Sequence, residues 1–315
     1  MTKRAFSFPG QGSQAVGMGK DLADAFPEAR AVFAEVDEAL GQKLSAIMFA
    51  GPAETLTLTE NAQPALMAVS MAVIRVLEAK GVKVQDTAAY VAGHSLGEYS
   101  ALCAAGVFSL SDAARLLRTR GRAMQQAIPV GQGAMAAILG LDLDTVLKAA
   151  EDAGQGEVCN VANDNAPGQV VISGHVGAVN RAIELLKAAG AKRALPLPVS
   201  APFHCALMKP AADAMQQALD QVKVLEPWVP VVVNVLARPE TDPVQIKKCL
   251  VEQVTDMVRW TESVKWLASE GGVTELYELG AGKVLTGLAK RIAPDVAATA
   301  VNTPADIDAL VAALA

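Results

Sequence analysis

Short apolar runs of strand length alternate with longer segments of helical periodicity along most of the chain. Gly and Pro separate many of these segments, as Pro9-Gly10 does after the first run. This alternation favours an α/β fold with a largely parallel sheet. The clearest elements are the strand 4–8, the helix 64–80, the strand 88–93, a helix from Leu96 onward, the helix 111–128, the helix 206–222, the strand 231–235, helices flanking 252–270, and a strand at 276–279 that leads through Gly280-Ala281-Gly282 into a helix.

The pattern of predicted strands and helices changes between residues 129 and 197. The elements expected there are strands at 134–139, 158–162, 169–172 and 194–197, with helices at 143–153 and 176–189. Their order, βαββαβ, is that of a ferredoxin-like unit. We expect an inserted subdomain at 129–197 in a core made of 1–128 and 198–315, the alternative being more of one α/β sheet.

The composition indicates a folded protein, since 52% of the 315 residues are apolar and 19% are charged. A net charge of −6 argues against general nucleic-acid binding, which needs a basic surface. No apolar run approaches the roughly 18 residues of a membrane span, and Pro9 interrupts the N-terminal segment before a secretory apolar region can form. We expect a cytoplasmic protein with no membrane or nucleic-acid partner, in which four scattered cysteines are idle thiols and not a metal site: Cys103, Cys159, Cys205 and Cys249.

The run Gly93-His94-Ser95-Leu96-Gly97 lies between a predicted strand and a predicted helix, the setting of a nucleophile elbow. So sharp a turn brings both glycine positions against neighbouring backbone, where a Cβ would collide. Ser95 then projects at a helix N-terminus, where free N–H groups and the helix dipole stabilise an oxyanion. The motif predicts an acyl-transfer enzyme with Ser95 as its nucleophile, the alternative being a chance match in a glycine-rich chain.

A serine nucleophile needs a base, and the chain has three histidines. We expect His94 to point away from the hydroxyl of its neighbour, and a turn or capping role suffices for His175. His204 precedes a helix outside the insertion, so elimination leaves it as the base. A carboxylate, an amide or a backbone carbonyl could orient its imidazole, and the residues alone do not choose among them.

One charge interrupts the apolar face of the helix 111–128. At about 100° per residue, Arg115, Arg118 and Arg122 fall on the solvated side, whereas Arg120 lies near the middle of the apolar stripe. An unpaired charge there is costly, and a snorkelling side chain is the alternative interpretation. We favour a guanidinium that points into a cleft and holds a carboxylate in two parallel hydrogen bonds. The substrate would then be an acyl group with a terminal carboxylate.

Four motifs occur in order along the chain: Phe8-Pro9-Gly10-Gln11-Gly12-Ser13-Gln14, Gly93-His94-Ser95-Leu96-Gly97-Glu98-Tyr99, Pro202-Phe203-His204 and Gly282-Lys283-Val284-Leu285. With them, essentially the whole chain resembles the malonyl-CoA:acyl carrier protein transacylases of bacterial fatty-acid synthesis. The resemblance implies an α/β-hydrolase-like core interrupted by a ferredoxin-like subdomain. It also implies malonyl transfer from malonyl-CoA to the phosphopantetheine thiol of acyl carrier protein, through a covalent malonyl-Ser95 ester and without a metal or other cofactor.

The resemblance also assigns roles by position. They are Ser95 as nucleophile, His204 as base, Gln253 as the residue whose main-chain carbonyl orients the histidine, Gln11 and the backbone of Leu96 as the oxyanion hole, Arg120 as the ligand of the malonyl carboxylate, and Asn165 as a further site residue.

Two positions depart from the family pattern. Ala281 stands where proline is common, which we expect to alter only loop stiffness. Phe203 stands where some members have serine, and a bulky side chain beside the base would crowd a substituent on the malonyl Cα. The sequence therefore predicts a preference for malonyl over methylmalonyl.

The acceptor side of the reaction is less defined. Acyl carrier proteins are generally acidic and this chain is net acidic too, so docking needs a local basic patch. We expect a monomer whose candidate docking residues are Lys187, Lys192, Arg193, Lys283, Lys290 and Arg291.

Other functions compete with this one. An acyltransferase that loads a polyketide-synthase carrier protein is the nearest rival. A serine esterase, lipase or thioesterase shares the elbow but gives no reason for Arg120 or for the Gln11 motif. NAD or ATP binding fails, because neither glycine-rich segment has the G-x-G-x-x-G or Walker A spacing. A scaffold with a decayed site is disfavoured, because the nucleophile, base, oxyanion and arginine positions are all occupied by suitable residues.

Overall fold

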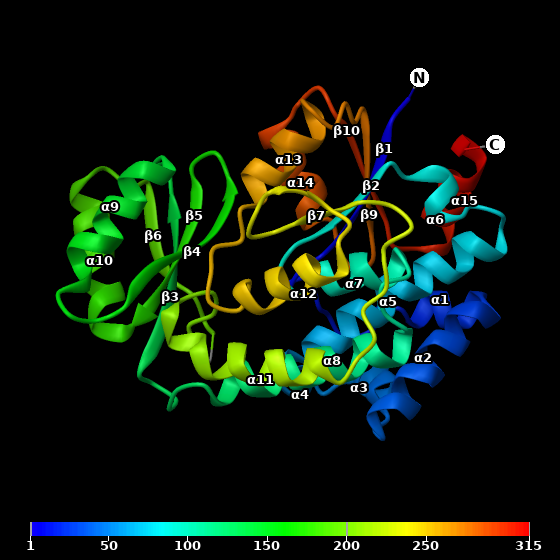
Figure 1. Cartoon of the computed structure of the whole chain (residues 1–315), viewed down its shortest axis with the longest axis horizontal. Helices are drawn as coiled ribbons and strands as arrows, with labels where there is room; N and C mark the ends of the chain where they lie inside the picture. The colour runs from blue at the N-terminus through cyan, green and yellow to red at the C-terminus, as the bar shows by residue number, and fades with distance from the viewer. Residues whose placement is uncertain (1, 200, 315) are drawn as a thin grey trace.

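The computed structural model describes residues 2–199 and 201–314, and its strands form two separate sheets (Figure 1). The strands are β1 (Arg4–Phe8), β2 (Tyr90–Gly93), β3 (Gly133–Leu139), β4 (Cys159–Ala166), β5 (Gln169–His175), β6 (Arg193–Pro196), β7 (Val231–Val233), β8 (Arg238–Glu240), β9 (Glu275–Leu279) and β10 (Ala297–Val301). The helices are α1 (Lys20–Ala25), α2 (Pro27–Leu40), α3 (Leu44–Ala50), α4 (Ala53–Thr57), α5 (Thr59–Ala79), α6 (Val84–Thr87), α7 (Gly97–Ala104), α8 (Leu110–Gln126), α9 (Leu143–Gly154), α10 (Val176–Ala188), the 3₁₀ turn η1 (Ala206–Met208), α11 (Lys209–Asp220), α12 (Pro243–Glu252), α13 (Trp260–Ala268), α14 (Val284–Ile292) and α15 (Pro304–Leu314).

The larger sheet has the strand order β10-β9-β1-β2-β7-β8, and all its pairings are parallel except β7 with β8. Both of its faces are covered, because Phe6 and Phe8 pack into one hydrophobic cluster while Ala5 packs into another. The first cluster includes α2, α5, α7 and α8, and the second includes α13 and α14. A parallel sheet buried on both sides confirms the predicted α/β class.

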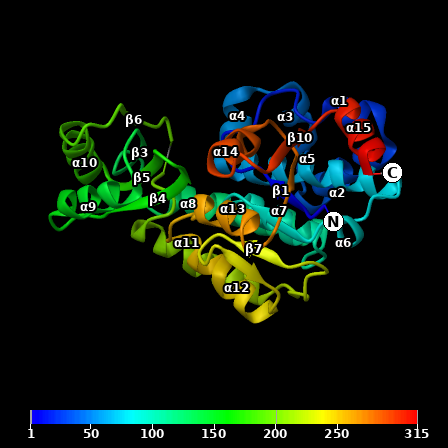
Figure 2. The same cartoon turned by 90° about the horizontal axis from the view of Figure 1, so that it is seen from above.

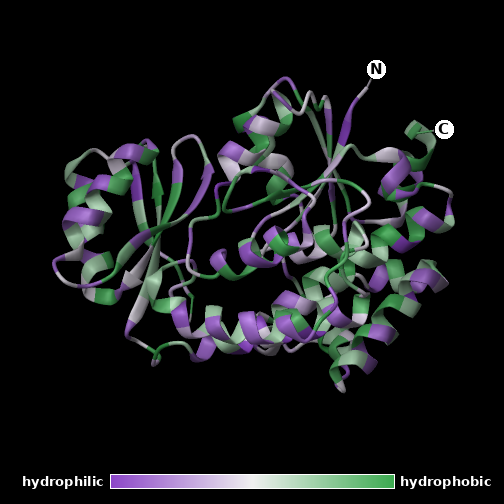
Figure 3. Cartoon of the chain, in the orientation of Figure 1, coloured by the Kyte–Doolittle hydropathy of each residue, from purple (hydrophilic) through white to green (hydrophobic). Residues whose placement is uncertain are grey.

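The smaller sheet has the order β4-β5-β3-β6 with every pairing antiparallel. Helices α9 and α10 cover one face, where alternate strand residues such as Ile138 and Ile172 are buried. The opposite face presents Met135, Ala162 and Val171, against which Phe203 packs. This unit lies at one end of the molecule, away from both termini (Figure 1 and Figure 2). Its helices alternate between hydrophobic and hydrophilic residues, as amphipathic helices on a sheet do (Figure 3).

Helix α5 begins at Thr59, five residues before the expected start at Pro64. The expectation rested on the frequency of proline in a first helical turn. Here the preceding turn is helical as well, because Asn61, Ala62 and Gln63 are all buried against the surrounding helices. By length and composition α5 could cross a membrane, but 83% of its most apolar window is buried inside the protein.

The segment 206–222 is also divided differently than predicted, into η1 and α11. Pro210 stands in the first turn of α11, where its missing N–H costs nothing. Pro210 also has no N–H to donate back to the turn before it, and the chain enters α11 through a short 3₁₀ turn.

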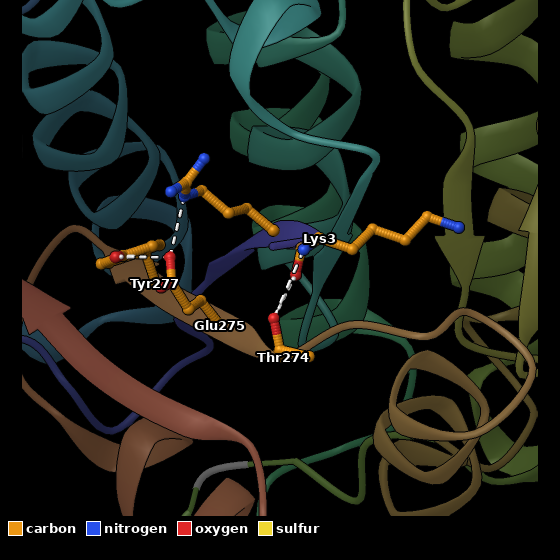
Figure 4. A network of polar contacts seen from close by, with 5 residues as sticks. Lys3, Thr274, Glu275 and Tyr277 are labelled. Carbon is orange, nitrogen blue, oxygen red and sulfur yellow. Dashed lines mark hydrogen bonds and ion pairs between the residues drawn. The ribbon is translucent and has the colours of Figure 1, made fainter. Parts of the chain in front are cut away.

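Polar contacts tie the amino ends of β1 and β9 together (Figure 4). The Lys3 N–H donates to Thr274 Oγ1 at 3.3 Å, and Glu275 Oε2 accepts from Arg4 Nε at 2.8 Å and from the Tyr277 hydroxyl at 3.0 Å. These contacts fix the register of two central strands. They lie at the sheet edge opposite to the one where β2 leads into α7, so they have no part in the candidate site.

Candidate active site

The turn from β2 to α7 is as tight as the glycine spacing predicts. A Cβ on Gly93 would lie 1.9 Å from the carbonyl oxygen of Gly97, and one on Gly97 would lie 2.2 Å from that of Phe8. Ser95 between them has φ 53°, a left-handed conformation that is rare for residues other than glycine. Packing around the turn therefore holds the serine in a strained position that presents its hydroxyl.

The carboxyl ends of three neighbouring strands converge on this turn. Gln11 follows β1, Ser95 follows β2 and Asn234 follows β7. The Asn234 side chain brackets the elbow: its Oδ1 accepts from the Ser95 N–H at 2.8 Å, and its Nδ2 donates to the carbonyl of Gly93 at 2.7 Å. Sites of α/β proteins lie at this edge of the sheet, where loops from adjacent strands meet.

His204 contacts the serine hydroxyl directly, with 2.7 Å between its Nε2 and Ser95 Oγ. Its Nδ1 lies 2.7 Å from the main-chain carbonyl of Gln253. A carbonyl oxygen only accepts, so Nδ1 carries the proton and Nε2 is the free acceptor. His204 is thus oriented to take the Ser95 proton, and its φ of 56° shows that it too is held in a strained backbone conformation.

His204 is 4% exposed. Burial, together with the positive charge of Arg120, lowers its pKa to about 3. The neutral form, which alone can act as a base, therefore persists well below the ordinary pKa of histidine.

Arg120 lies inside the protein, as its place on the apolar stripe predicts, with 1% of its surface exposed. Its Nη2 donates to Ser95 Oγ at 3.1 Å and to Gln253 Oε1 at 2.8 Å, and its Nη1 donates to Gln63 Oε1 at 2.9 Å. The guanidinium also lies over the ring of Tyr99, 5.8 Å from its centroid. None of these partners carries a formal negative charge, so a cation stands ready beside the nucleophile.

The prediction that Arg118 belongs to the solvated face is wrong. Only 8% of its surface is exposed, and its Nη1 lies 3.7 Å from Glu60 Oε2. Helical periodicity placed it correctly relative to Arg120, but α5 packs along α8 and covers this side as well. Arg115 and Arg122 are exposed, as predicted.

The side chain of Gln253 joins several site residues. Besides accepting from Arg120, it donates from Nε2 to the Ser95 carbonyl at 3.0 Å and to Glu98 Oε2 at 2.9 Å. Sequence reasoning missed Asn234, Glu98 and Gln63 as members of the site. Of these three, only Glu98 could have been found from the sequence, because it directly follows the motif around Ser95.

The two residues predicted to form the oxyanion hole are Leu96, within the elbow, and Gln11, in the loop after β1. Leu96 follows the serine and precedes α7, so its N–H belongs to the first helical turn, where amides have no helical acceptor. Gln11 is exposed in the loop after β1, and its side chain donates to Thr59 Oγ1 at 3.4 Å.

Asn165 and Phe203 approach from the smaller sheet and from the loop after it. His94 Nε2 lies 2.8 Å from Asn165 Oδ1, so this histidine is engaged away from the Ser95 hydroxyl. Phe203 is half-buried beside the base, between the two sheets. His175 lies apart, with its Nδ1 accepting from the Val158 N–H at 2.9 Å. The four cysteines are buried free thiols.

The geometry is that of a serine nucleophile, an oriented histidine and a buried cation, and comparisons with known proteins agree. The acyl transferase domain family matches residues 5–302. The malonyl CoA-acyl carrier protein transacylase of Escherichia coli (strain K12) is 53% identical over 96% of this chain and 97% of its own. The chain belongs to the malonyl-CoA:acyl carrier protein transacylase family.

Solved structures of this family are similar over their whole length. The acyl-carrier-protein S-malonyltransferase of Bartonella henselae has a TM-score of 0.97 at 57% identity, covering 99% of both chains. A malonyl-transacylase in complex with its type II polyketide-synthase acyl carrier protein has a TM-score of 0.95 at 48% identity, covering 99% of this chain and 100% of its own. As a member of this family the chain is an acyltransferase.

Proposed function

We propose that the chain transfers the malonyl group from malonyl-CoA to the phosphopantetheine thiol of acyl carrier protein for fatty-acid synthesis. The observation that carries this proposal is the buried Arg120 guanidinium, 3.1 Å from the oxygen of an activated serine. A cation at that distance selects an acyl group whose far end is a carboxylate. The names of the relatives supply the acyl donor and the acceptor.

In the first half-reaction His204 Nε2 takes the hydroxyl proton as Ser95 Oγ attacks the thioester carbonyl. The N–H groups of Gln11 and Leu96 stabilise the oxyanion of the tetrahedral intermediate. The C–S bond then breaks, and His204 returns the proton to the CoA thiolate. Malonyl remains as an ester on Ser95.

In the second half-reaction the phosphopantetheine thiol loses its proton to His204 Nε2 and attacks the same ester. The bond from the carbonyl carbon to Ser95 Oγ breaks, and the proton returns to the serine. Throughout both halves Nδ1 keeps its hydrogen bond to the Gln253 carbonyl, which holds the imidazole in one orientation.

Selection of the acyl group follows from charge pairing. The malonyl carboxylate would form two parallel hydrogen bonds with Arg120, whereas an acetyl group would leave this buried cation without an anionic partner. Asn165 would contribute a further polar contact to the bound substrate from the end of β4. None of these steps requires a metal or another cofactor.

We propose that Phe203, the half-buried residue that precedes the base in sequence, adds selectivity at the Cα of the acyl group. A methyl branch at Cα would meet this ring, so we propose that malonyl is preferred over methylmalonyl. Similar kcat/KM values for malonyl-CoA and methylmalonyl-CoA in the purified enzyme would contradict this, and Phe203→Ser should narrow the preference.

We also propose that the fold has two parts: an α/β-hydrolase-like core (1–128 and 198–315) and a ferredoxin-like insertion (129–197). The strand order β4-β5-β3-β6 and the βαββαβ element order support the second assignment. We propose a cytoplasmic monomer, and a basic docking region that includes Lys192 and Arg291. These two side chains line a cavity of about 550 Å³ between the smaller sheet and α14.

A polyketide-synthase carrier protein is the second candidate acceptor. It is favoured by the relative at 48% identity whose complex contains such a carrier. Malonyl-enzyme offered equal amounts of a fatty-acid carrier and a type II polyketide carrier would decide between them by the rate of each transfer.

The covalent step is tested by incubating the protein with malonyl-CoA or with acetyl-CoA and measuring its intact mass. We expect a malonyl adduct that is absent from Ser95→Ala, and little acetyl adduct. A wild-type protein that forms no adduct with either thioester would refute the covalent mechanism. A dominant acetyl adduct would refute the role of Arg120.

A further inference from the structure

Glu98 is a carboxyl group with no exposure to solvent, in the first turn of α7. Its Oε2 accepts from the Asn234 N–H at 2.9 Å and from Gln253 Nε2 at 2.9 Å, while Oε1 has no partner among the described residues. Burial raises its pKa to about 7. Burying a carboxyl group costs free energy when one of its two oxygens has no hydrogen-bond partner. The acyl-transfer steps described above give Glu98 no role.

The two partners of Glu98 are the residues that assemble the site. Asn234 brackets the elbow through Ser95 and Gly93. Gln253 orients the base through its main-chain carbonyl and holds Arg120 through its side chain. The nucleophile, the base and the carboxylate-binding cation therefore all connect to one carboxyl oxygen through a single intermediate residue.

The polarity of the contacts fixes how the Gln253 amide is turned. The Arg120 guanidinium can only donate, so it faces Oε1, and the Glu98 and Ser95 oxygens both accept from Nε2. Without Glu98 the NH₂ group of the Gln253 amide loses one of its three acceptors and keeps the Ser95 carbonyl and the longer contact to Asn234 Oδ1 at 3.3 Å. Asn234 loses the only acceptor that its N–H has among the described residues. Both side chains would then gain freedom at the positions they have to hold.

We propose that Glu98 is a positioning residue for acyl transfer, which holds Asn234 and Gln253 so that Ser95, His204 and Arg120 form one rigid unit. The inference rests on the proposed malonyl transfer. Glu98 contacts no reacting atom and acts through its two partners. Because both hydrogen bonds go to one oxygen, a carboxamide oxygen would serve as well as a carboxylate oxygen.

Three variants separate positioning from folding. Glu98→Met fills the same volume and removes both the acceptor and the buried charge, so its cost to the fold is limited to the two donors that it leaves without Glu98 Oε2. Glu98→Gln keeps an acceptor oxygen. Glu278→Met is the matched control, since Glu278 is 1% exposed and its carboxylate accepts only from the first turn of α14 within the described chain.

We expect Glu98→Met to remain folded and to lose about 10²-fold in kcat/KM for malonyl-CoA, as small misplacements of reacting groups do. Acetyl transfer should fall about tenfold less, since it does not use Arg120. Glu98→Gln should recover both to within about fivefold of wild type, because the two hydrogen bonds of Oε2 are kept. Glu278→Met should lower the thermal midpoint without changing the malonyl-to-acetyl ratio.

The proposal is overturned if folded Glu98→Met transfers malonyl at the wild-type rate, or loses malonyl and acetyl transfer by the same factor. If Glu98→Met does not fold, Glu98→Asp decides, because it keeps the charge but withdraws the oxygen by one methylene. Wild-type malonyl transfer in that variant also overturns the proposal. Wild-type enzyme run in parallel separates the two hypotheses: if it forms no malonyl-Ser95 adduct, the proposed function itself has failed.

Discussion

The two sheets of this molecule are built on opposite principles. The larger one is mostly parallel and buried on both faces, and the chain leaves adjacent strands at one edge, where Gln11, Ser95 and Asn234 gather. The smaller one is antiparallel and has its own core against α9 and α10. It brings Asn165 toward the site, near the end of β4.

The difference suggests that the two sheets contribute differently to the site, one to the chemical steps and the other to substrate binding. Ser95 is anchored at a strand end of the larger sheet, and His204, in the loop between β6 and η1, is fixed by its hydrogen bond to the Gln253 carbonyl at the end of α12. The smaller sheet contributes Asn165, whose Oδ1 lies 2.8 Å from Nε2 of His94 in the elbow. Changes at the first set should affect the chemistry itself, and changes at the second set should affect how well substrate is held.

The largest expected effect is at the base. His204→Ala leaves Ser95 without a proton acceptor, so malonyl-enzyme formation should fall by about 10³-fold or more. Rapid-quench measurement of the adduct by mass would show this. A loss below tenfold would mean that another group serves as the base.

Arg120→Ala is expected to lower malonyl transfer far more than acetyl transfer. Malonyl transfer should lose about 10²- to 10³-fold, because a charge-assisted pair with the carboxylate disappears, while acetyl transfer should change little. Comparing kcat/KM for the two thioesters measures this directly. Equal losses would refute a role for Arg120 in carboxylate binding.

The pH dependence of the first half-reaction tests the environment of His204. An ordinary histidine with a pKa of 6.5 would be about 3% neutral at pH 5, costing roughly 30-fold in rate. Because the pKa of His204 is lowered to about 3, its base form persists, and single-turnover acylation should fall less than threefold between pH 7 and pH 5. Arg120→Ala removes one cause of the shift, so the fall in its acetylation rate should begin at a higher pH.

Among the substitutions, the smallest expected effect is at the smaller sheet. Asn165→Ala removes one neutral hydrogen-bonding side chain, so KM for malonyl-CoA should rise by about three- to tenfold with kcat nearly unchanged. Steady-state kinetics would establish this split. A fall in kcat as large as that of His204→Ala would contradict the division between the two sheets.

Periodicity and glycine spacing predicted much of this molecule before any coordinates. The strand 4–8 and the order of elements between 133 and 196 agree closely with expectation. The elements α1, α3, α4, β8 and β10 were not predicted, because runs this brief carry little periodic signal. The helix α2 was not predicted either, although it has 14 residues. Arg120 was predicted to be unusual because a charge on an apolar stripe is visible in sequence.

The remaining site residues could not be found from pattern. Gln253 was expected only by resemblance, since the atom that meets His204 is a main-chain oxygen, which every residue has. Asn234 is brought to the elbow by strand order, which local sequence does not encode. Arg118 was misjudged for the same reason, because the burial of a helix side depends on which neighbour packs there.

His204 is held by a backbone carbonyl and lies near a cation, an arrangement that bears on the lifetime of the acyl ester. Such an imidazole is a weak base. The Ser95 hydroxyl is about as weakly acidic as water, but it is held 2.7 Å from Nε2, a fixed contact that an incoming water does not have. An incoming thiol, whose ordinary pKa is about 8.5, gives up its proton far more readily than water, whose pKa is about 15.7. We therefore expect the malonyl-Ser95 ester to react slowly with water and fast with a thiol. Although the nucleophile and base resemble those of a hydrolase, the acyl group would be transferred and not hydrolysed.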